Sequence, residues 1–284
     1  MAHVAVLGAG TMGHGIAQVC AMAGYDVKLA DATEEFARRG ADRIRANLDE
    51  GVKRGKLETQ AVADHMSRIA VSSSIELACA GADTIIEAVP EKVELKQDVL
   101  VRAERAAPSA SLLASNTSSL SIGDMQAWLV RPAAFIGLHF FNPVHINRLV
   151  EVVRGPATAQ TTVDRGLELV KRIGKEAVLV NDSPGFATSR LGVLLGLEAM
   201  RMVEEGVASA ADIDKAMELG YRHPMGPLRL TDLVGLDVRL DIARYLHDKL
   251  GAEHFRPPRI LETMVEAGQL GRKSGRGFYD WPAE

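Results

Sequence analysis

The 284-residue sequence has little cysteine, no excess of basic residues and no long apolar run. Its two cysteines, Cys20 and Cys79, stand far apart in stretches with helical patterning. We expect reduced, partly buried thiols, and the lack of a CxxC pair or a Cys/His cluster excludes the usual zinc patterns. A membrane-spanning helix needs roughly 20 apolar residues. The apolar run Leu191–Leu197 is interrupted by glycines and ends at Glu198, so it does not qualify.

The formal net charge of −4 excludes another set of functions. Binding to nucleic acids and anionic membranes is driven by clustered Lys and Arg, so this composition gives no general attraction to either. The first ten residues, MAHVAVLGAG, contain no Lys or Arg and therefore lack the basic region of a secretory signal. We expect a cytoplasmic protein that binds neither nucleic acid nor membrane.

What the sequence does have is the composition of a soluble globular protein, with 47% hydrophobic and 25% charged residues. Its length corresponds to roughly two domains of ~150 residues. In the first half, helical stretches alternate with short apolar runs. The predicted strands are Val4–Leu7, Asp26–Ala30, Thr84–Ala88, Leu112–Ala114, Phe135–Leu138, Leu149–Val153 and Ala177–Val180, and the predicted helices are Met12–Ala23, Glu34–Lys53 and Val93–Ala107. This alternation predicts a mostly parallel sheet with both faces covered.

The pattern changes at residues 181–185, where the sequence NDSPG is dense in turn residues. Beyond this point we predict no strand. The predicted helices are Phe186–Glu205, Ala210–Leu219, Leu236–Leu250 and Arg259–Ala267. We therefore expect an α/β domain over residues 1–182 and an all-helical domain over residues 183–284.

A glycine-rich hexapeptide, GAGTMG, lies directly after the first predicted strand and directly before the first helix. This context is what the dinucleotide-binding fingerprint requires. Gly8 permits the tight turn, Gly10 lets the backbone approach a pyrophosphate, and Gly13 allows the helix to pack closely on the strand. The helix N-terminus then offers unpaired N–H groups and a positive dipole end to the phosphates.

An acidic residue, Asp31, ends the second predicted strand, 18 residues after Gly13. A carboxylate at this place accepts hydrogen bonds from the adenosine ribose and repels a 2′-phosphate, which favours NAD over NADP. The alternative is a plain loop at Gly8–Gly13 with Asp31 as a helix N-cap. Because strand, turn, helix, strand and acid follow in order, we predict a Rossmann-type domain that binds NAD.

Polar groups gather at the predicted strand ends. Asn116 and Ser118 follow one strand, His139 follows another, and Glu151 lies within a third. Strand ends of this kind line the ligand crevice of open α/β sheets, and a histidine there can exchange a proton near neutral pH. A carboxylate on its other ring nitrogen would fix the tautomer. The residues alone leave a purely structural histidine as the alternative, because spacing does not show that Glu151 meets His139.

The chain resembles the 3-hydroxyacyl-CoA dehydrogenase family, in particular its bacterial 3-hydroxybutyryl-CoA members, over nearly its whole length. The resemblance rests on motifs that are specific when found together and in order. They are VLGAGTMGHGIAQ at Val6–Gln18, EAVPE at Glu87–Glu91, SNTSSLSI at Ser115–Ile122, GLHFFNPV at Gly137–Val144, LVEVV at Leu149–Val153, DSPGF at Asp182–Phe186, HPMGPLRLTDLVGLD at His223–Asp237 and GRKSGRGFYDW at Gly271–Trp281.

The resemblance implies a role for each matching residue. His139 matches the catalytic base that takes the proton of the 3-hydroxyl as hydride leaves C3, and Glu151 matches its carboxylate partner. Ser118 matches the serine that bonds the substrate oxygen, and Asn116 matches an asparagine near nicotinamide and substrate. The other implied cofactor contacts are Gly8, Gly10, Thr11, Met12, Gly13, Asp31, Glu91 and Lys96, and the other implied substrate contacts are Asn142, Ser189, Lys53 and Lys56.

Several of these residues also have plainer interpretations. The Ser118 hydroxyl alternatively caps a turn, since the sequence SNTSS favours turns capped by hydroxyl groups. Taken alone, Lys96 is interpreted as a solvated lysine on a helix. Glu91 is interpreted in the same way as an acid at the start of a helix. Ser189 stands where the family commonly has asparagine, which leaves its substrate contact open. Lys53 to Lys56 are either a solvated cluster at a helix end or ligands for the phosphates of coenzyme A.

Three functions are consistent with the sequence. The leading one is NAD-dependent oxidation of (3S)-3-hydroxyacyl-CoA, of short chain, to 3-oxoacyl-CoA. The second is a dehydrogenase of the same architecture acting on a hydroxy acid without CoA, such as a sugar acid. The third is a non-catalytic NAD-binding protein. The resemblance also implies that the helical domain forms the acyl-CoA cleft and makes a homodimer contact.

Overall fold

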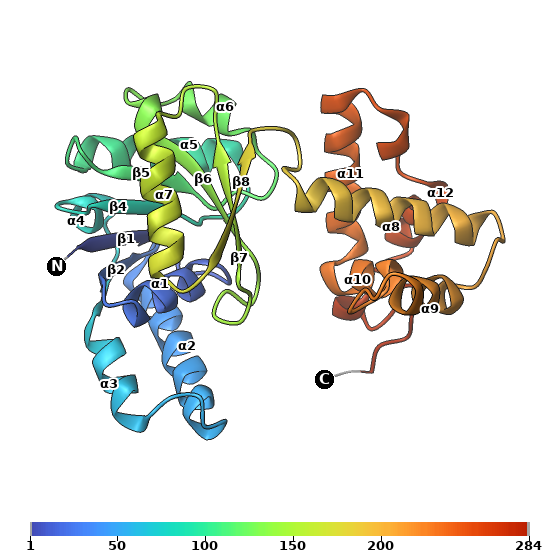
Figure 1. Ribbon diagram of the computed structural model, residues 1–284, viewed down its shortest axis with the longest axis horizontal. Coiled ribbons are helices and arrows are strands. Elements are labelled where there is room, and N and C mark those ends of the chain that lie inside the picture. Colours follow the sequence, from blue (N-terminus) through green and yellow to red (C-terminus); the bar gives the residue numbers. More distant parts are fainter. Residues whose placement is uncertain (1, 283–284) are drawn as a thin grey trace. The chain divides into compact units, whose positions relative to one another are not determined.

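The protein, as a computed structural model, divides into two compact units, and residues 2–282 are described (Figure 1). The first unit covers Met1–Ser183 and the second covers Pro184–Glu284.

The described residues of the first unit form an eight-stranded sheet in the order β3-β2-β1-β4-β5-β6-β7-β8. Its strands are β1 (His3–Leu7), β2 (Asp26–Ala30), β3 (Ile69–Ser72), β4 (Thr84–Glu87), β5 (Leu112–Ser115), β6 (Phe135–Phe140), β7 (Leu149–Arg154) and β8 (Glu176–Asn181). Neighbours from β3 to β6 are parallel, β7 is antiparallel to β6, and β8 is parallel to β7. The predicted α/β class, with a mostly parallel sheet, is confirmed.

The strand order indicates where a ligand binds at the edge of the sheet. The chain runs outward from β1 to β2 and β3, then crosses back to β4 on the other side of β1. In open α/β sheets, ligands bind at such a reversal, outside the carboxyl ends of the strands. The glycine-rich loop after β1 lies at this reversal, and so do the residues that follow β4.

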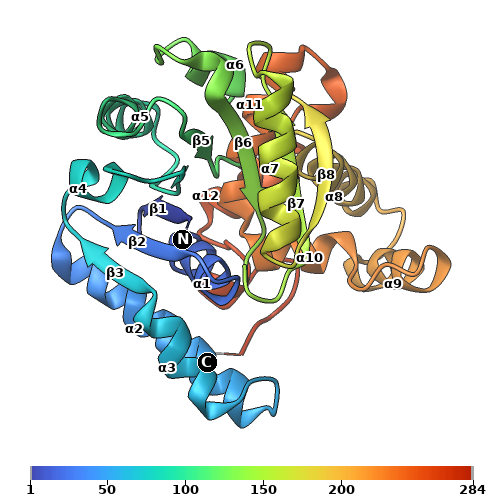
Figure 2. The ribbon, with the colours of Figure 1, turned by 60° about the vertical axis from the view of Figure 1, so that its left-hand side comes forward.

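Helices cover the sheet of the first unit. They are α1 (Gly13–Met22), α2 (Glu34–Lys53), α3 (Thr59–Ser67), α4 (Ile75–Cys79), α5 (Val93–Ala106), α6 (Ile122–Gln126) and α7 (Gln160–Arg172). Figure 2 shows α7 lying along β6, β7 and β8, against which it packs. The core between strands and helices consists of fully buried aliphatic side chains such as Val6, Leu29 and Ile86.

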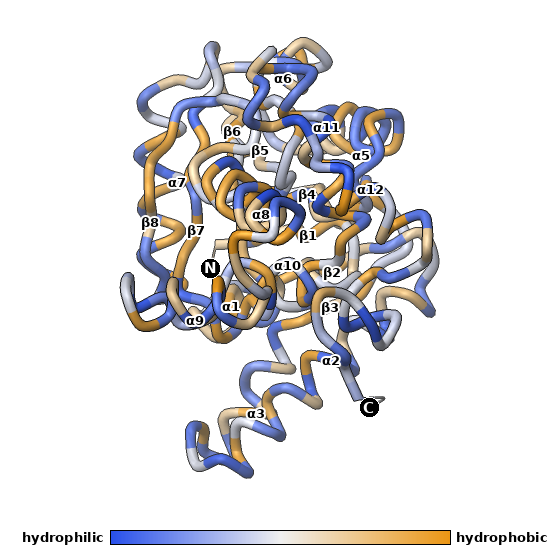
Figure 3. The backbone as a smooth tube through the Cα atoms, turned by 90° about the vertical axis from the view of Figure 1, so that its right-hand side faces the viewer, coloured by the Kyte–Doolittle hydropathy of each residue, from blue (hydrophilic) through white to orange (hydrophobic). Residues whose placement is uncertain are grey.

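The long helix α2 owes its position to a cap and an apolar stripe. Its N-cap is Thr33, whose hydroxyl accepts a hydrogen bond from the Phe36 N–H. Its buried residues recur at helical spacing, namely Ala37, Gly40, Ile44 and Leu48. In Figure 3 the colour along α2 accordingly alternates between hydrophilic and hydrophobic. The stripe fixes which residues of α2 face the sheet and the glycine-rich loop.

The described part of the second unit is helical and has its own core. Its helices are α8 (Thr188–Glu204), α9 (Ala210–Gly220), α10 (Pro227–Val234), α11 (Leu236–Leu250) and α12 (Arg259–Glu266). The core includes Leu197, Met200, Leu240 and Phe255. The buried Asp232 accepts hydrogen bonds from the backbone N–H groups of Phe278 and Tyr279 and from the Trp281 indole, so it ties the end of the described chain to α10.

Two predicted boundaries need correction. The helix predicted from Phe186 begins at Thr188, because Phe186 has a φ of 48°, which a right-handed helix does not allow. The strand predicted to end at Leu138 continues to Phe140, so His139 lies within β6 and not after it. No helix within residues 2–282 is long and apolar enough to span a membrane.

Candidate active site

The glycine-rich loop after β1 packs closely on neighbouring backbone and leaves part of its own backbone open to a ligand. A Cβ on Gly8 would lie 2.6 Å from the Ala88 carbonyl oxygen, and Gly8 also has a φ of 103°. A Cβ on Gly13 would lie 1.7 Å from the Gly8 carbonyl oxygen. At Gly10, by contrast, a Cβ would meet nothing within 4 Å. Two glycines are therefore needed for packing, while the third leaves open backbone for a ligand.

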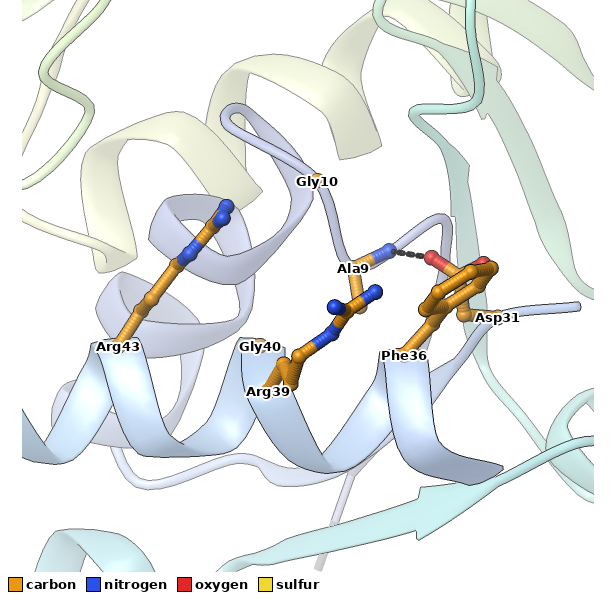
Figure 4. A pocket seen from close by; sticks show the side chains of 7 residues that line it. All are labelled: Ala9, Gly10, Asp31, Phe36, Arg39, Gly40 and Arg43. Atoms are coloured by element: carbon orange, nitrogen blue, oxygen red, sulfur yellow. Dashed lines mark hydrogen bonds between the residues drawn. The ribbon is translucent and has the colours of Figure 1, made fainter. Parts of the chain in front are cut away.

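Asp31 joins this loop to the end of β2. Its Oδ2 accepts a hydrogen bond from the Ala9 N–H at 2.7 Å, drawn in Figure 4, and its Oδ1 accepts one from the Ala32 N–H at 2.7 Å. The interpretation of Asp31 as an N-cap is wrong, because Thr33 caps α2. The carboxylate is therefore held by backbone donors beside the loop, where a ribose would contact it.

A cavity of about 760 Å³ runs along the loop and the ends of β1, β2 and β4. Gly10, Thr11, Met12 and Asp31 line it. Apolar walls come from residues such as Ile75, Val89, Leu95 and Val99. A mostly apolar cleft with a few placed polar groups suits an adenine nucleotide, so the residues present fit a dinucleotide.

His139 and Glu151 are in direct contact. They oppose each other in the antiparallel β6–β7 pair, and His139 Nδ1 lies 2.7 Å from Glu151 Oε2. Glu151 is fully buried and His139 is 7% exposed. The Phe141 ring packs on the imidazole, with 4.4 Å between ring centroids. The register of two strands therefore provides a buried imidazole–carboxylate pair.

The loop after β5 is fixed against β6 by Asn116. The Asn116 side-chain oxygen accepts a hydrogen bond from the Phe140 N–H at 2.8 Å, next to His139 in the chain. The turn that follows is capped by Thr117, whose hydroxyl accepts from the N–H groups of Ser119 and Leu120. The Thr117 hydroxyl therefore caps this turn. Ser118, the next residue, is only partly buried.

A buried ionic network lies between β4 and this loop. The Lys96 ammonium donates to both oxygens of Glu87, at 2.8 and 3.0 Å, and lies 3.1 Å from Glu91 Oε2. The other oxygen of Glu91 accepts hydrogen bonds from the Thr117 hydroxyl and from the Ser118 and Ser119 N–H groups. Lys96 is fully buried, so the interpretation as a solvated lysine is wrong.

Burial and neighbouring groups shift the pKa values of the two glutamates in this network in opposite directions. Burial alone would raise the pKa of Glu91, but the Lys96 charge and the donors of the 117–119 turn outweigh it and leave that pKa below its ordinary value. At Glu87 burial is the stronger effect and raises the pKa, against the opposing influence of Lys96 and Ser115. The network therefore holds ionised Glu91 at the edge of the loop that contains Ser118.

Two sequence profiles together match nearly the whole chain. The profile described as 3-hydroxyacyl-CoA dehydrogenase, NAD binding domain, matches residues 3–183, and the profile of the C-terminal domain of the same enzyme matches residues 185–281. The chain belongs to the 3-hydroxyacyl-CoA dehydrogenase family. It is an oxidoreductase with an NAD-binding domain, and its family implies an acyl-CoA substrate.

Individual relatives agree with this assignment. A probable 3-hydroxybutyryl-CoA dehydrogenase of Bacillus subtilis is 44% identical over 98% of this chain and 96% of its own length. A 3-hydroxyadipyl-CoA dehydrogenase of Escherichia coli is 41% identical over 99% of this chain and 59% of its own. The crystal structure of (S)-3-hydroxybutyryl-CoA dehydrogenase PaaH1 from Ralstonia eutropha has a TM-score of 0.96, with 39% identity and 99% of both chains covered.

The remaining predicted substrate-binding residues of this dehydrogenase belong to three different segments of the chain. Lys53 is the last residue of α2 and is exposed, with its ammonium 3.9 Å from Glu50, and Lys56 is exposed in the turn beyond it. Asn142 is exposed after β6. Ser189 belongs to the second unit, in the first turn of α8. Their substrate contacts remain predictions.

Sequence reasoning missed Glu87, Ser115 and Thr117. Glu87 stood within the predicted strand Thr84–Ala88 and at the start of the EAVPE motif, but an acid in an apolar run gives no sign of its partner. The only sign of the pair in the sequence is the spacing, because Glu87 in the strand precedes Lys96 in the following helix by nine residues. Within the described residues, no group of His, Cys, Asp and Glu is arranged to hold a metal ion.

Proposed function

We propose that this dehydrogenase interconverts (3S)-3-hydroxybutyryl-CoA and acetoacetyl-CoA, with His139 as the catalytic base and acid. The observation that carries the proposal is the 2.7 Å contact between His139 and the buried Glu151, in the same sheet as the dinucleotide cleft. The short acyl chain is supported by the names of the relatives from Bacillus subtilis and Ralstonia eutropha.

The proton chemistry follows from the imidazole–carboxylate pair. NAD, when bound, supplies the hydride acceptor. Loss of hydride from C3 turns the alcohol into a ketone, so the hydroxyl proton must pass to a base. With Nδ1 bonded to Glu151, we assign this proton to Nε2 of His139. Glu151 then stabilises the imidazolium, and in the reverse reaction the same imidazolium protonates the developing alkoxide.

The loop after β5 orients the reacting groups in this proposal. Ser118 donates to the substrate oxygen, and Asn116 holds the loop against the backbone beside His139. Glu91 and Lys96 keep the turn in place from the cofactor side, since Glu91 accepts from Ser118 N–H at 3.0 Å. Groups of this kind lower the activation barrier because they hold the reacting atoms in the orientation that the reaction needs.

The test is steady-state oxidation of NADH with acetoacetyl-CoA and with longer 3-oxoacyl-CoA esters. We expect turnover with acetoacetyl-CoA and a kcat/KM that declines as the acyl chain lengthens. Free 3-oxo and 3-hydroxy acids serve as the control. Turnover of the free acids together with no turnover of the CoA ester at high protein concentration contradicts the proposal and favours a hydroxy-acid dehydrogenase.

A further inference from the structure

The carboxylate of Glu87 lies where the wall of the dinucleotide cleft and the loop after β5 both begin. Glu87 ends β4, and the residues directly after it, 88–90, line the dinucleotide cleft. The β4–β5 register pairs Glu87 with Ser115, the last residue of β5, and the loop that contains Ser118 follows from there. One side chain therefore stands between two segments that the proposed reaction needs.

Hydrogen-bond donors surround this carboxylate. Its Oε1 accepts from the Val89 N–H at 2.7 Å, and its Oε2 accepts from the Ser115 hydroxyl at 2.5 Å. The Lys96 ammonium donates to both oxygens, at 2.8 and 3.0 Å. Glu87, Lys96 and Ser115 are fully buried, so bulk water does not replace a partner that is lost.

The Ser115 hydroxyl extends this anchoring into the loop after β5. It donates to Glu87, and its oxygen accepts a hydrogen bond from the Thr117 N–H at 3.2 Å. Thr117 caps the turn and directly precedes Ser118. Glu91 also bonds this turn, but its side chain is 34% exposed. Glu87 and Ser115 thus hold the turn from within the sheet, while Glu91 holds it from the solvent side.

We propose that Glu87 and Ser115 are positioning residues that fix the Ser118 hydroxyl beside the dinucleotide cleft, acting through the Thr117 amide. This inference rests on the proposed function, in which Ser118 donates to the substrate oxygen. The rate depends steeply on such placement, since an error of about 1 Å in the position of a reacting group costs up to ~10²-fold. Because Glu87 and Ser115 are fully buried, they act on the substrate through the turn.

Glutamine at position 87 would separate the two connections of the carboxylate. An amide has one accepting oxygen and one donating nitrogen. Since a backbone N–H only donates, the oxygen must stay with Val89, and the nitrogen then faces Ser115. Lys96 keeps this oxygen and Glu91 as acceptors. The Ser115 hydroxyl must accept where it now donates, so its proton loses its acceptor. Glu87→Gln therefore loosens the turn and leaves the cleft wall in place.

The kinetic test combines steady-state reduction of acetoacetyl-CoA with NADH binding measured by fluorescence. In Glu87→Gln and in Ser115→Ala we expect kcat to fall about 10–100-fold, while the Kd of NADH changes by less than about threefold. The double variant should lose no more than the more impaired single variant, because both substitutions break the same connection.

Two matched controls measure what a merely structural loss does. Glu104, a buried glutamate of α5, accepts from the Val130 and Arg131 N–H groups. Ser111, a buried serine directly before β5, donates to the Ala82 carbonyl. Glu104→Gln and Ser111→Ala should lower the midpoint of thermal unfolding by amounts comparable to the test variants, because each also disrupts a buried hydrogen bond, and should keep the wild-type kcat.

Amide hydrogen exchange of the full chain, measured by mass spectrometry, tests the positioning without turnover. We expect faster exchange over residues 116–120 in both test variants and unaltered exchange there in both controls. The proposal is overturned if this exchange is unaltered in the test variants, or if their kcat stays at the wild-type value, since Glu91 then suffices to hold the turn. A loss of NADH affinity as large as the loss of kcat also overturns it. If the wild type does not reduce acetoacetyl-CoA, the proposed function fails, and the exchange measurement still decides the positioning.

Discussion

At the scale of single residues, Glu91 connects Lys96 with the turn that contains Ser118. Because its pKa in the folded protein is below the ordinary 4.5, its ionised form stabilises the fold above that pH, and this stabilisation is lost as the pH falls through the lowered pKa. We predict that Glu91→Gln lowers the urea midpoint of unfolding at pH 7 and that the gap to the wild type narrows below about pH 4.5. A gap of equal size at pH 7 and pH 4 contradicts this prediction.

The residues of the site were predictable to different degrees. The roles of Gly8, Gly13 and Asp31 follow from local chain geometry, so the sequence alone places them. The contact between His139 and Glu151 depends on the register of β6 and β7, which spacing does not reveal. The burial of Lys96 against Glu87 depends on how α5 packs on β4. Pairs made by tertiary packing were therefore found through the resemblance or not at all.

At the scale of elements, the contact of α2 with the glycine-rich loop depends on Gly40. A Cβ there would meet the Ala9 Cβ at 2.7 Å and the Ala9 carbonyl oxygen at 2.9 Å. Since backbone must move, we predict that Gly40→Ala costs about 1–3 kcal/mol of stability and raises the KM for NADH. Thermal unfolding and steady-state kinetics measure both effects.

The matched control for Gly40→Ala is Gly51→Ala, on the same helix. The three nearest atoms to the added methyl group all belong to the Leu57 side chain, the closest at 2.9 Å, and this side chain can rotate aside. Because alanine is the better helix former, we expect Gly51→Ala to be neutral or slightly stabilising with an unaltered KM for NADH. Equal losses in the two variants would mean that the loop contact is not what matters at Gly40.

Several of the elements were predictable from their sequence patterns. The helix over Glu34–Lys53 and the strand over Asp26–Ala30 have the predicted bounds. No prediction covered β3, a four-residue strand that is only partly buried, because so short a run resembles a loop. No prediction covered α7 either, although its apolar positions recur at helical spacing. Short edge strands acquire their structure from neighbours, and sequence patterns alone do not contain that information.

At the scale of the whole molecule, the predicted homodimer remains untested. The second unit has several exposed apolar side chains, among them Leu191 and Leu195 on α8 and Leu233 and Val234 on α10. Apolar side chains that gather into one exposed patch mark protein–protein interfaces, so these side chains are the candidates for the dimer contact. We predict a particle of twice the 30.5 kDa chain mass by light scattering, and a monomer for Leu191→Arg. A wild-type monomer at micromolar concentration contradicts the predicted dimer.

The most direct measurement for the whole account is the rate of NADH oxidation by acetoacetyl-CoA in His139→Gln. Glutamine keeps a polar side chain in β6 but does not exchange a proton, so we predict that kcat falls ~10²–10⁴-fold. His65→Gln, in α3 and outside the site, is the matched control and should retain the wild-type rate. A His139→Gln enzyme that binds NADH and keeps the wild-type kcat would contradict the assignment of His139 as the catalytic acid and base.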